Sequence, residues 1–251
     1  MKIGIIGIGA IGSTIAKKLS AVGHQVKVTN TAKPSELAIK AKELNAIPAT
    51  IEEVVKDVEV IILSVPLTAI SKLPKDLFKD IPNDVVVVDT SNYYPFRDGE
   101  IEELKNGKVE SEWVSEQIGK PIIKAFNNIL AYSLEHLGKA KGEENRISIA
   151  VAGDSEKAKE IVSHLINDTG FDAVDVGLLS QSWRQQPGTP AYCTELNATD
   201  LKQALADGIQ EKAASIREFA IAKIMESISP LSHTEMVELN RSLFPKNPKE
   251  E

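Results

Sequence analysis

The sequence predicts an α/β protein with a doubly wound, mostly parallel sheet and a small helical region at its C-terminal end. Short apolar segments alternate along the chain with longer amphipathic segments, an order that places helices on both faces of a parallel sheet. The chain has 251 residues, of which 42% are hydrophobic and 26% are charged, the composition of a globular protein. This length suits one large domain or two modest ones.

Each predicted element rests on a local signal. The predicted strand 58–65 contains the unbroken apolar stretch 60–63, as expected for a strand buried on both faces. Pro34 opens a helix at its first turn, where a missing N–H costs nothing, and Asp154 is placed as the N-cap of a later helix. The predicted strands cover residues 2–7, 25–29, 58–65, 85–89, 121–125, 147–151 and 173–176. The predicted helices cover residues 10–22, 34–44, 50–55, 67–72, 101–106, 111–118 and 155–168.

The character of the sequence changes after residue 177, so we divide the chain into a domain 1–177 and a C-terminal region 178–251. Residues 181–192 contain two prolines and a glycine, which predict a structured loop. Two helices are then predicted, over residues 199–227 and 233–243. Apolar residues recur on the first at helical spacing and need a packing partner, either in this chain or in a second copy, which makes a homodimer compatible with the sequence. The charged residues 246–251 are expected to fray.

The charge balance narrows the classes of partner. The chain has 29 Lys and Arg against 36 Asp and Glu, a formal net charge of −7. We therefore expect no nucleic-acid binding, which needs a positive field. No apolar run approaches the roughly 20 residues of a membrane-spanning helix. A single cysteine, Cys193, cannot form an internal disulfide, which fits a reducing, cytoplasmic compartment.

The acidic excess lies in the second half of the chain. Residues 1–126 carry 16 basic and 17 acidic side chains, whereas residues 127–251 carry 13 and 19. An anionic ligand is therefore expected in the first half.

A glycine-rich segment joins the first predicted strand to the first predicted helix. Residues 7–12 read Gly-Ile-Gly-Ala-Ile-Gly, which has the GxGxxG spacing in the strand–loop–helix context that a dinucleotide site requires. Gly7 permits the tight turn, Gly9 lets the backbone approach a pyrophosphate, and Gly12 lets the helix lie close to the sheet. The N–H groups at the helix start, including those of Ala10 and Ile11, would face the phosphates. The alternative is a glycine-rich turn without a ligand.

The end of the second strand indicates which nicotinamide dinucleotide would bind. An NAD site normally has an acidic residue roughly 20 positions past the fingerprint, but this chain has none before Glu36. Hydroxyl, amide and ammonium groups suit a 2′-phosphate instead, so NADP is the predicted cofactor. The alternative is a polar loop whose lysine is merely solvated. The predicted 2′-phosphate pocket consists of Asn30, Thr31, Lys33 and Ser35.

Several segments resemble the NADPH:coenzyme F420 oxidoreductases. They are the opening residues 1–12, the run Lys124-Ala125-Phe126-Asn127, and the segments 152–154, 170–177 and 182–192, the last being similar to the bacterial branch. The resemblance spans about residues 1–192. It implies a Rossmann dinucleotide-binding domain with a small C-terminal part, often in a dimer. It also implies direct hydride transfer between C4 of the nicotinamide and C5 of a deazaflavin.

By motif position, the resemblance implies further cofactor contacts. Val65, Pro66 and Leu67, after the strand 58–65, would line the adenosine side. The residues implied to border the nicotinamide are Ser91, Asn92, Ala125, Phe126 and Asn127. The chain departs from many members in having Thr31-Ala32-Lys33 where they carry serine-arginine. Many bacterial relatives lie in organisms that make no F420, so a flavin or a related carrier stays open as the second hydride carrier.

Other residues have two interpretations each. Trp183 is either a buried loop anchor or a stacking wall for a flat ring system, with Arg184 facing an anionic tail, and we retain both as candidate substrate-binding residues. Lys124 holds a strand end in register or places its ammonium near the cofactor, and we favour the structural role. The catalytic residues are unknown. No metal site is expected, because none of His24, His136, His164 or His233 has a second ligand at metal-binding spacing.

Three functions follow from these patterns. The first is an NADP-dependent oxidoreductase that passes hydride to or from a small-molecule deazaflavin, flavin or related carrier. The second is a dehydrogenase of small hydroxy or imino acids, which needs an acid–base residue such as Lys202 or Lys212 in the C-terminal helices. The third is a non-enzymatic NADP-binding sensor or partner protein.

Overall fold

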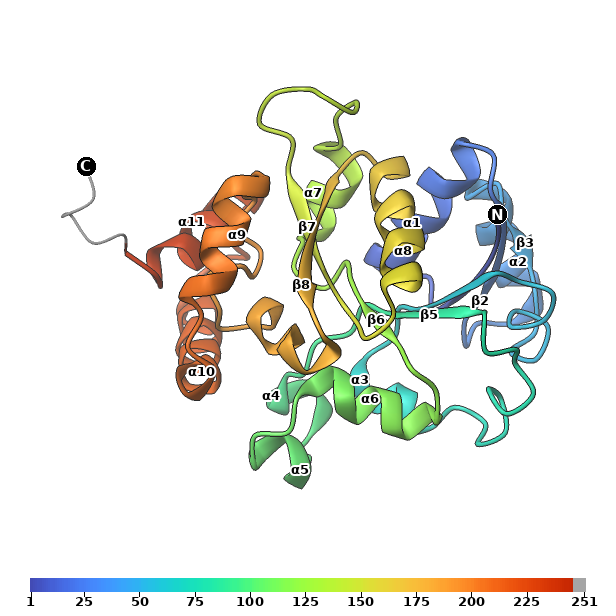
Figure 1. The fold of residues 1–251 in the computed structure, drawn as a ribbon, viewed down its shortest axis with the longest axis horizontal. Coiled ribbons are helices and arrows are strands. Elements are labelled where there is room, and N and C mark those ends of the chain that lie inside the picture. The colour runs from blue at the N-terminus through green and yellow to red at the C-terminus, as the bar shows by residue number, and fades with distance from the viewer. Residues whose placement is uncertain (246–251) are drawn as a thin grey trace.

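The computed structural model describes residues 1–245, which form one eight-stranded sheet with helices on both faces (Figure 1). The strands are β1 Lys2–Ile6, β2 Gln25–Thr29, β3 Ile47–Pro48, β4 Val60–Leu63, β5 Val86–Asp89, β6 Ile123–Lys124, β7 Ser148–Ala152 and β8 Asp172–Gly177. The helices are α1 Ala10–Ala21, α2 Pro34–Glu43, α3 Leu67–Ile70, α4 Pro95–Asp98, α5 Glu102–Lys105, α6 Glu110–Ile118, α7 Ala131–His136, α8 Glu156–Asp168, α9 Ala198–Asp207, α10 Gln210–Glu226 and α11 His233–Ser242, with a 3₁₀ helix η1 at Leu179–Gln185.

The strand order is β3-β2-β1-β4-β5-β6-β7-β8. All neighbouring pairs are parallel except β6 and β7, which meet at the antiparallel pair Lys124 and Ala152. The predicted fold class, a doubly wound and mostly parallel sheet, is therefore confirmed. Because β1, β2, β4, β5 and β6 run parallel, the loops that follow them lie at the same edge of the sheet. Open α/β sheets bind ligands at this edge, at the point where the strand order reverses, which here lies between β1 and β4.

Two apolar layers enclose the sheet. Ile3 and Ile5 of β1 pack in the core under α1, α2 and α8, whereas Ile6 packs in the core under α3 and α6, because alternate residues of a strand point to opposite faces. A third cluster joins Leu201 and Leu205 of α9 to β7 and β8. In Figure 1, α9, α10 and α11 lie beyond the β8 edge of the sheet. The division into domains at residue 177, where β8 ends, remains a prediction.

Two of the predicted helices do not form as single helices. Residues 50–55 form a turn, in which Thr50 and Glu53 bond reciprocally and Val54 is pressed against β1. The predicted helix 199–227 is two helices, α9 and α10. They separate at Gly208, which lies against the ring of Trp183.

Two smaller differences lie between residues 154 and 185. The N-cap of α8 is Ser155, whose side chain accepts from the N–H of Ala158. Asp154 instead accepts from the N–H of Leu179 and fixes the start of η1, a helical segment that begins the predicted loop 181–192.

The tail 246–251, expected to fray, lies outside the described residues. Within residues 1–245, no helix combines the length and the apolar character needed to cross a bilayer.

Candidate functional site

The glycine loop contains two glycines that the fold itself requires. Gly7 has a φ of +95°, and a Cβ there would lie 2.3 Å from the carbonyl oxygen of Ser64. A Cβ on Gly12 would lie 2.0 Å from the carbonyl oxygen of Gly7. Both distances are far inside van der Waals contact, so the turn and the packing of α1 on the sheet exclude any side chain at these two positions.

Gly9 is different, because nothing in the fold requires a glycine there. Its backbone is extended, with φ −68° and ψ −164°, and a Cβ would meet no atom within 4 Å. Gly9 alone among the 15 glycines, all of which lie in the described residues, combines an ordinary φ with open space. Gly9 is also the N-cap of α1, and no side chain caps this helix. The open space therefore lies over unpaired backbone N–H groups, an arrangement suited to an anion.

The predicted 2′-phosphate pocket lies beside the glycine loop. The N–H of Gly7 donates to the carbonyl of Thr29 at the end of β2, at 2.9 Å. Asn30 accepts from the N–H of Ala32 at 3.0 Å, which bends the chain toward α2. Lys33 is the N-cap residue of α2, and no side chain caps this helix. The side chains of Asn30, Thr31, Lys33 and Ser35 are all exposed.

The loop after β4 borders the glycine loop on its other side. The N–H of Ser64 donates to the carbonyl of Ile6 at 2.8 Å, and Val65 lies next to Gly7. Pro66 is exposed, whereas the Leu67 side chain is fully buried in the core under α3. The side-chain surface that this loop offers to a ligand is thus that of Val65 and Pro66.

Three amides connect the loops after β5 and β6. Asn92 and Asn127 form a pair of hydrogen bonds, from Asn92 Nδ2 to the Asn127 carbonyl at 2.9 Å and from Asn127 Nδ2 to Asn92 Oδ1 at 3.0 Å. Gln185 Nε2 donates to Asn127 Oδ1 at 2.7 Å. Phe126 is buried beside them with a φ of +60°, a strained conformation for a bulky residue. Gln185 was not predicted, because nothing local marks it as a partner of a residue 58 positions earlier.

A buried ion pair holds together the strand ends from which these loops begin. Lys124 Nζ lies 2.6 Å from Asp89 Oδ2 and donates to the Ser91 carbonyl at 2.5 Å. Lys124 is 1% exposed and Asp89 is fully buried. The ammonium therefore joins the ends of β5 and β6, in agreement with its favoured structural interpretation.

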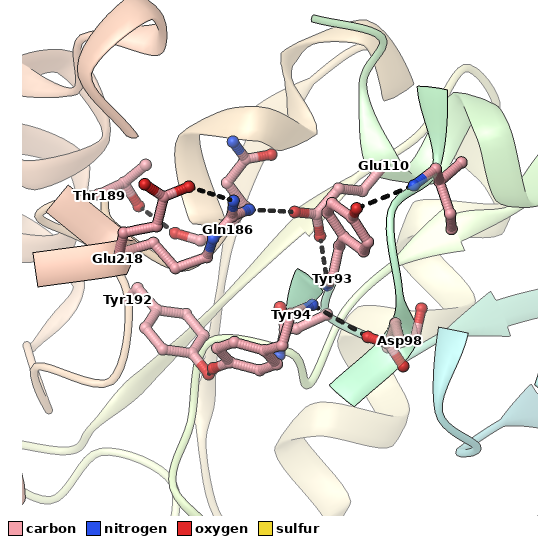
Figure 2. A network of polar contacts seen from close by, with 12 residues as sticks. Tyr93, Tyr94, Asp98, Glu110, Gln186, Thr189, Tyr192 and Glu218 are labelled. Atoms are coloured by element: carbon pink, nitrogen blue, oxygen red, sulfur yellow. Dashed lines mark hydrogen bonds and ion pairs between the residues drawn. The ribbon is translucent and has the colours of Figure 1, made fainter. Parts of the chain in front are cut away.

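A second buried pair links the site to the C-terminal helices. Glu110 of α6 accepts from the N–H of Tyr93 at 3.0 Å (Figure 2). It also lies 4.0 Å from the guanidinium of Arg217 on α10. Arg217 also lies over the Tyr93 ring, 5.3 Å from its centroid. Burial raises the pKa of Glu110, although the nearby cations lower it.

Gly188 brings α10 close to this network. Its φ is +86°, and a Cβ there would lie 2.0 Å from the carbonyl oxygen of Ala213 on α10. The loop after η1 and α10 therefore pack backbone against backbone.

Trp183 and Arg184 lie against α9. Trp183 is 7% exposed, with Gly208 against its ring. Arg184 stacks on Trp183 at 4.4 Å and donates to the carbonyl of Leu205 at 2.9 Å. These contacts favour the anchoring interpretation, and a substrate-binding role for the two residues stays a prediction.

The histidines are dispersed. His24 bonds to Asp168, His233 lies 2.8 Å from Glu195, and His136 is exposed on α7. Within residues 1–245, no three His, Cys, Asp or Glu side chains converge as a metal site. Cys193 is buried, and burial raises the pKa of its thiol to about 12, which argues against a nucleophilic role.

Known proteins that resemble this chain share the segment that contains the glycine loop and the loops after β4 and β5. Residues 2–93 match the family described as coenzyme F420-dependent NADP oxidoreductase. The protein YjhV of Escherichia coli is 32% identical over 110 residues, which are 44% of this chain and 80% of that protein. The chain belongs to this oxidoreductase family. Its chemistry is NADP-dependent oxidoreduction.

Two solved structures resemble this chain over most of its length. A hypothetical protein of Sinorhizobium meliloti, SMa0349, has a TM-score of 0.64 at 27% identity and covers 78% of this chain and 95% of its own. A protein of Arthrobacter sp. FB24, described as an F420-dependent NADP reductase, has a TM-score of 0.60 at 22% identity and covers 72% of this chain and 87% of its own. The second likeness concerns the fold alone.

Proposed function

We propose that this family member transfers hydride directly between C4 of the NADPH nicotinamide and a deazaflavin, a flavin or a related planar carrier. The observation that carries the proposal is the open space over Gly9 at an uncapped helix start. A fold without a ligand has no need of a glycine at this position. A dinucleotide pyrophosphate has that need, because its oxygens must approach the backbone closely.

The residues around this space fit the rest of NADP. The backbone N–H groups of Ala10 and Ile11 would hold the pyrophosphate. Val65, Pro66 and the uncapped start of α2 would hold the adenosine and its 2′-phosphate, with Lys33 as the cation. Bound NADPH supplies the hydride, and the chain supplies orientation.

The nicotinamide end is proposed to lie against the amides that join β5 and β6. The side chains of Asn92, Asn127 and Gln185 restrain one another through hydrogen bonds of 2.7–3.0 Å. A rigid amide surface would hold the ring in one orientation. The strained backbone of Phe126 and the adjacent Ala125 would form part of the same border.

A spectroscopic assay tests the proposal. NADPH is mixed with the protein and with F420, FMN or a ferric chelate in turn, and the loss of NADPH absorbance is followed. We expect protein-dependent turnover with at least one planar two-electron carrier. NADPH binding without turnover would favour the sensor interpretation.

Small keto and imino acids in the same assay would test the alternative dehydrogenase. That activity would call for an acid–base group in the C-terminal helices. Lys202 and Lys212, its candidates, are both exposed there.

A further inference from the structure

The hydroxyl groups of Tyr94 and Tyr192 meet (Figure 2), and Tyr94 follows the loop proposed to border the nicotinamide. The hydroxyl oxygens of Tyr94 and Tyr192 are 2.5 Å apart, although the residues are 98 positions apart in the chain. This is at the short end of O–H···O hydrogen bonds. Within residues 1–245, Tyr94 Oη makes no other hydrogen bond. Each phenol has one proton, so a pair that shares one bond leaves a second proton for a ligand.

Both tyrosines are held by the segments proposed to border the nicotinamide. Tyr94 is extended and lies two residues after Asn92, which places it within about 7 Å of Asn92 along the chain. Tyr192 precedes Cys193, whose N–H donates to the carbonyl of Asn128 at 3.1 Å. Asn128 Nδ2 in turn donates to the Ala191 carbonyl at 3.2 Å.

The surroundings of Tyr94 keep its phenol protonated and place one cation beside its ring. The guanidinium of Arg97 lies 5.2 Å from the Tyr94 ring centroid and is fixed by hydrogen bonds to Asp98 and to the Asn92 carbonyl. Burial raises the pKa of Tyr94 above its ordinary value, and the opposing effects of the hydrogen bond from Tyr192 and of the Arg97 charge do not offset that rise. Burial also raises the pKa of Tyr192. Both phenols are therefore protonated at neutral pH, so each has a proton to donate.

We propose that Tyr94 is the proton donor to the hydride acceptor and that Tyr192 is the relay that donates to Tyr94. This inference rests on the proposed function. The hydride moves from C4 of NADPH to an acceptor carbon or nitrogen, carrying both electrons. The acceptor heteroatom that gains negative charge takes the proton of Tyr94 Oη. The phenolate then takes the Tyr192 proton, and solvent returns a proton to Tyr192.

This arrangement selects a class of acceptor. A deazaflavin or a flavin gains one hydride and one proton, which the nicotinamide and Tyr94 would supply together. A one-electron acceptor such as a ferric chelate has no use for the phenolic proton. We therefore expect the protein to prefer two-electron acceptors with a protonatable heteroatom.

The replacement Tyr94→Phe tests the role, because it removes the hydroxyl and keeps the ring that packs against Phe96 and Arg97. We expect kcat to fall about 10²-fold or more, the usual contribution of a general acid, with NADPH affinity unchanged. Small general-acid buffers should restore part of the rate, which they would not do if the hydroxyl had only a structural role. Tyr192→Phe should lower kcat less, because Tyr94 keeps its own proton.

Tyr132→Phe is the matched control. Tyr132 is an exposed tyrosine of α7 whose hydroxyl forms no hydrogen bond within the described residues, and its removal should leave kcat unchanged.

The outcomes separate the two proposals. Wild-type turnover with an unchanged kcat in Tyr94→Phe, or a loss confined to NADPH affinity, would overturn the proton-donor role alone. A wild-type protein that transfers no hydride to any acceptor would overturn the proposed function and this role together.

Discussion

The two ends of the proposed site are built differently. The phosphate end is one contiguous hexapeptide whose backbone atoms are proposed to bind the pyrophosphate, and the feature that matters most there is the missing side chain of Gly9. The acceptor end is assembled from side chains brought together from distant segments, such as Tyr94 with Tyr192 and Asn127 with Gln185. The first end therefore depends on local geometry, whereas the second depends on how η1 and α10 dock on the sheet.

The largest effect is expected on stability, when the ion pair beneath the acceptor end of the site is broken. Replacing Lys124 by methionine leaves Asp89 charged and buried without its partner, which should destabilise the protein by about 3–5 kcal/mol. Denaturant unfolding measures this change. Replacing Asp89 by leucine in the same variant should recover most of the loss, whereas a double variant as unstable as the single one would contradict the ion-pair account. Lys105→Met, at an exposed ion pair, is the control and should change stability little.

The next largest effect separates ligand binding from folding at the phosphate end. Gly9→Val places a side chain in the open space over the uncapped start of α1, so NADPH affinity should fall by about 100-fold or more. The free energy of unfolding should change by less than about 1 kcal/mol, because the extended backbone suits valine. Gly12→Ala is the contrasting variant and should destabilise the fold, because its Cβ would clash with the Gly7 carbonyl. Binding titrations and thermal unfolding report the two properties, and unchanged NADPH affinity in Gly9→Val would refute the phosphate site.

A smaller effect tests the choice of cofactor. Lys33→Ala should reduce the preference for NADPH over NADH by about tenfold, since an exposed charge-assisted bond contributes roughly 1.5 kcal/mol. The ratio of the two dissociation constants is the measurement. Equal affinities for NADPH and NADH, unaffected by the replacement, would remove the 2′-phosphate assignment.

The smallest effect concerns Glu110 at the contact with α10. Its pKa is raised by burial, so the folded protein binds a proton that the unfolded chain has released. Proton binding by Glu110 therefore adds stability to the folded protein below the pKa that Glu110 has in the unfolded chain. This contribution declines as the pH rises toward the pKa of Glu110 in the folded protein. Relative to Glu110→Gln, the wild type should therefore lose stability with rising pH across this window and then stay level. Unfolding measured over a pH series checks the slope, and a slope of opposite sign would contradict the burial argument.

Sequence reasoning was most successful for features that are local. The glycine loop carries its own spacing between strand and helix, and the fold class follows from the alternation of apolar and amphipathic segments. The roles of the individual site residues stay predictions.

The contacts that sequence reasoning missed are long-range. Nothing in the segment around Tyr94 specifies a partner 98 positions away, and Gln185 has no motif of its own. The single helix expected over residues 199–227 failed for the same reason, because Gly208 breaks it in favour of packing on Trp183.

The central claim is direct hydride transfer from NADPH bound at this edge of the sheet. The measurement that tests it is turnover with NADPH deuterated at C4, using F420 as acceptor and mass spectrometry of the reduced deazaflavin. The account predicts that one of the two C4 positions delivers its deuterium to carbon C5 of the deazaflavin. Reduced deazaflavin that carries no label from either position would contradict it.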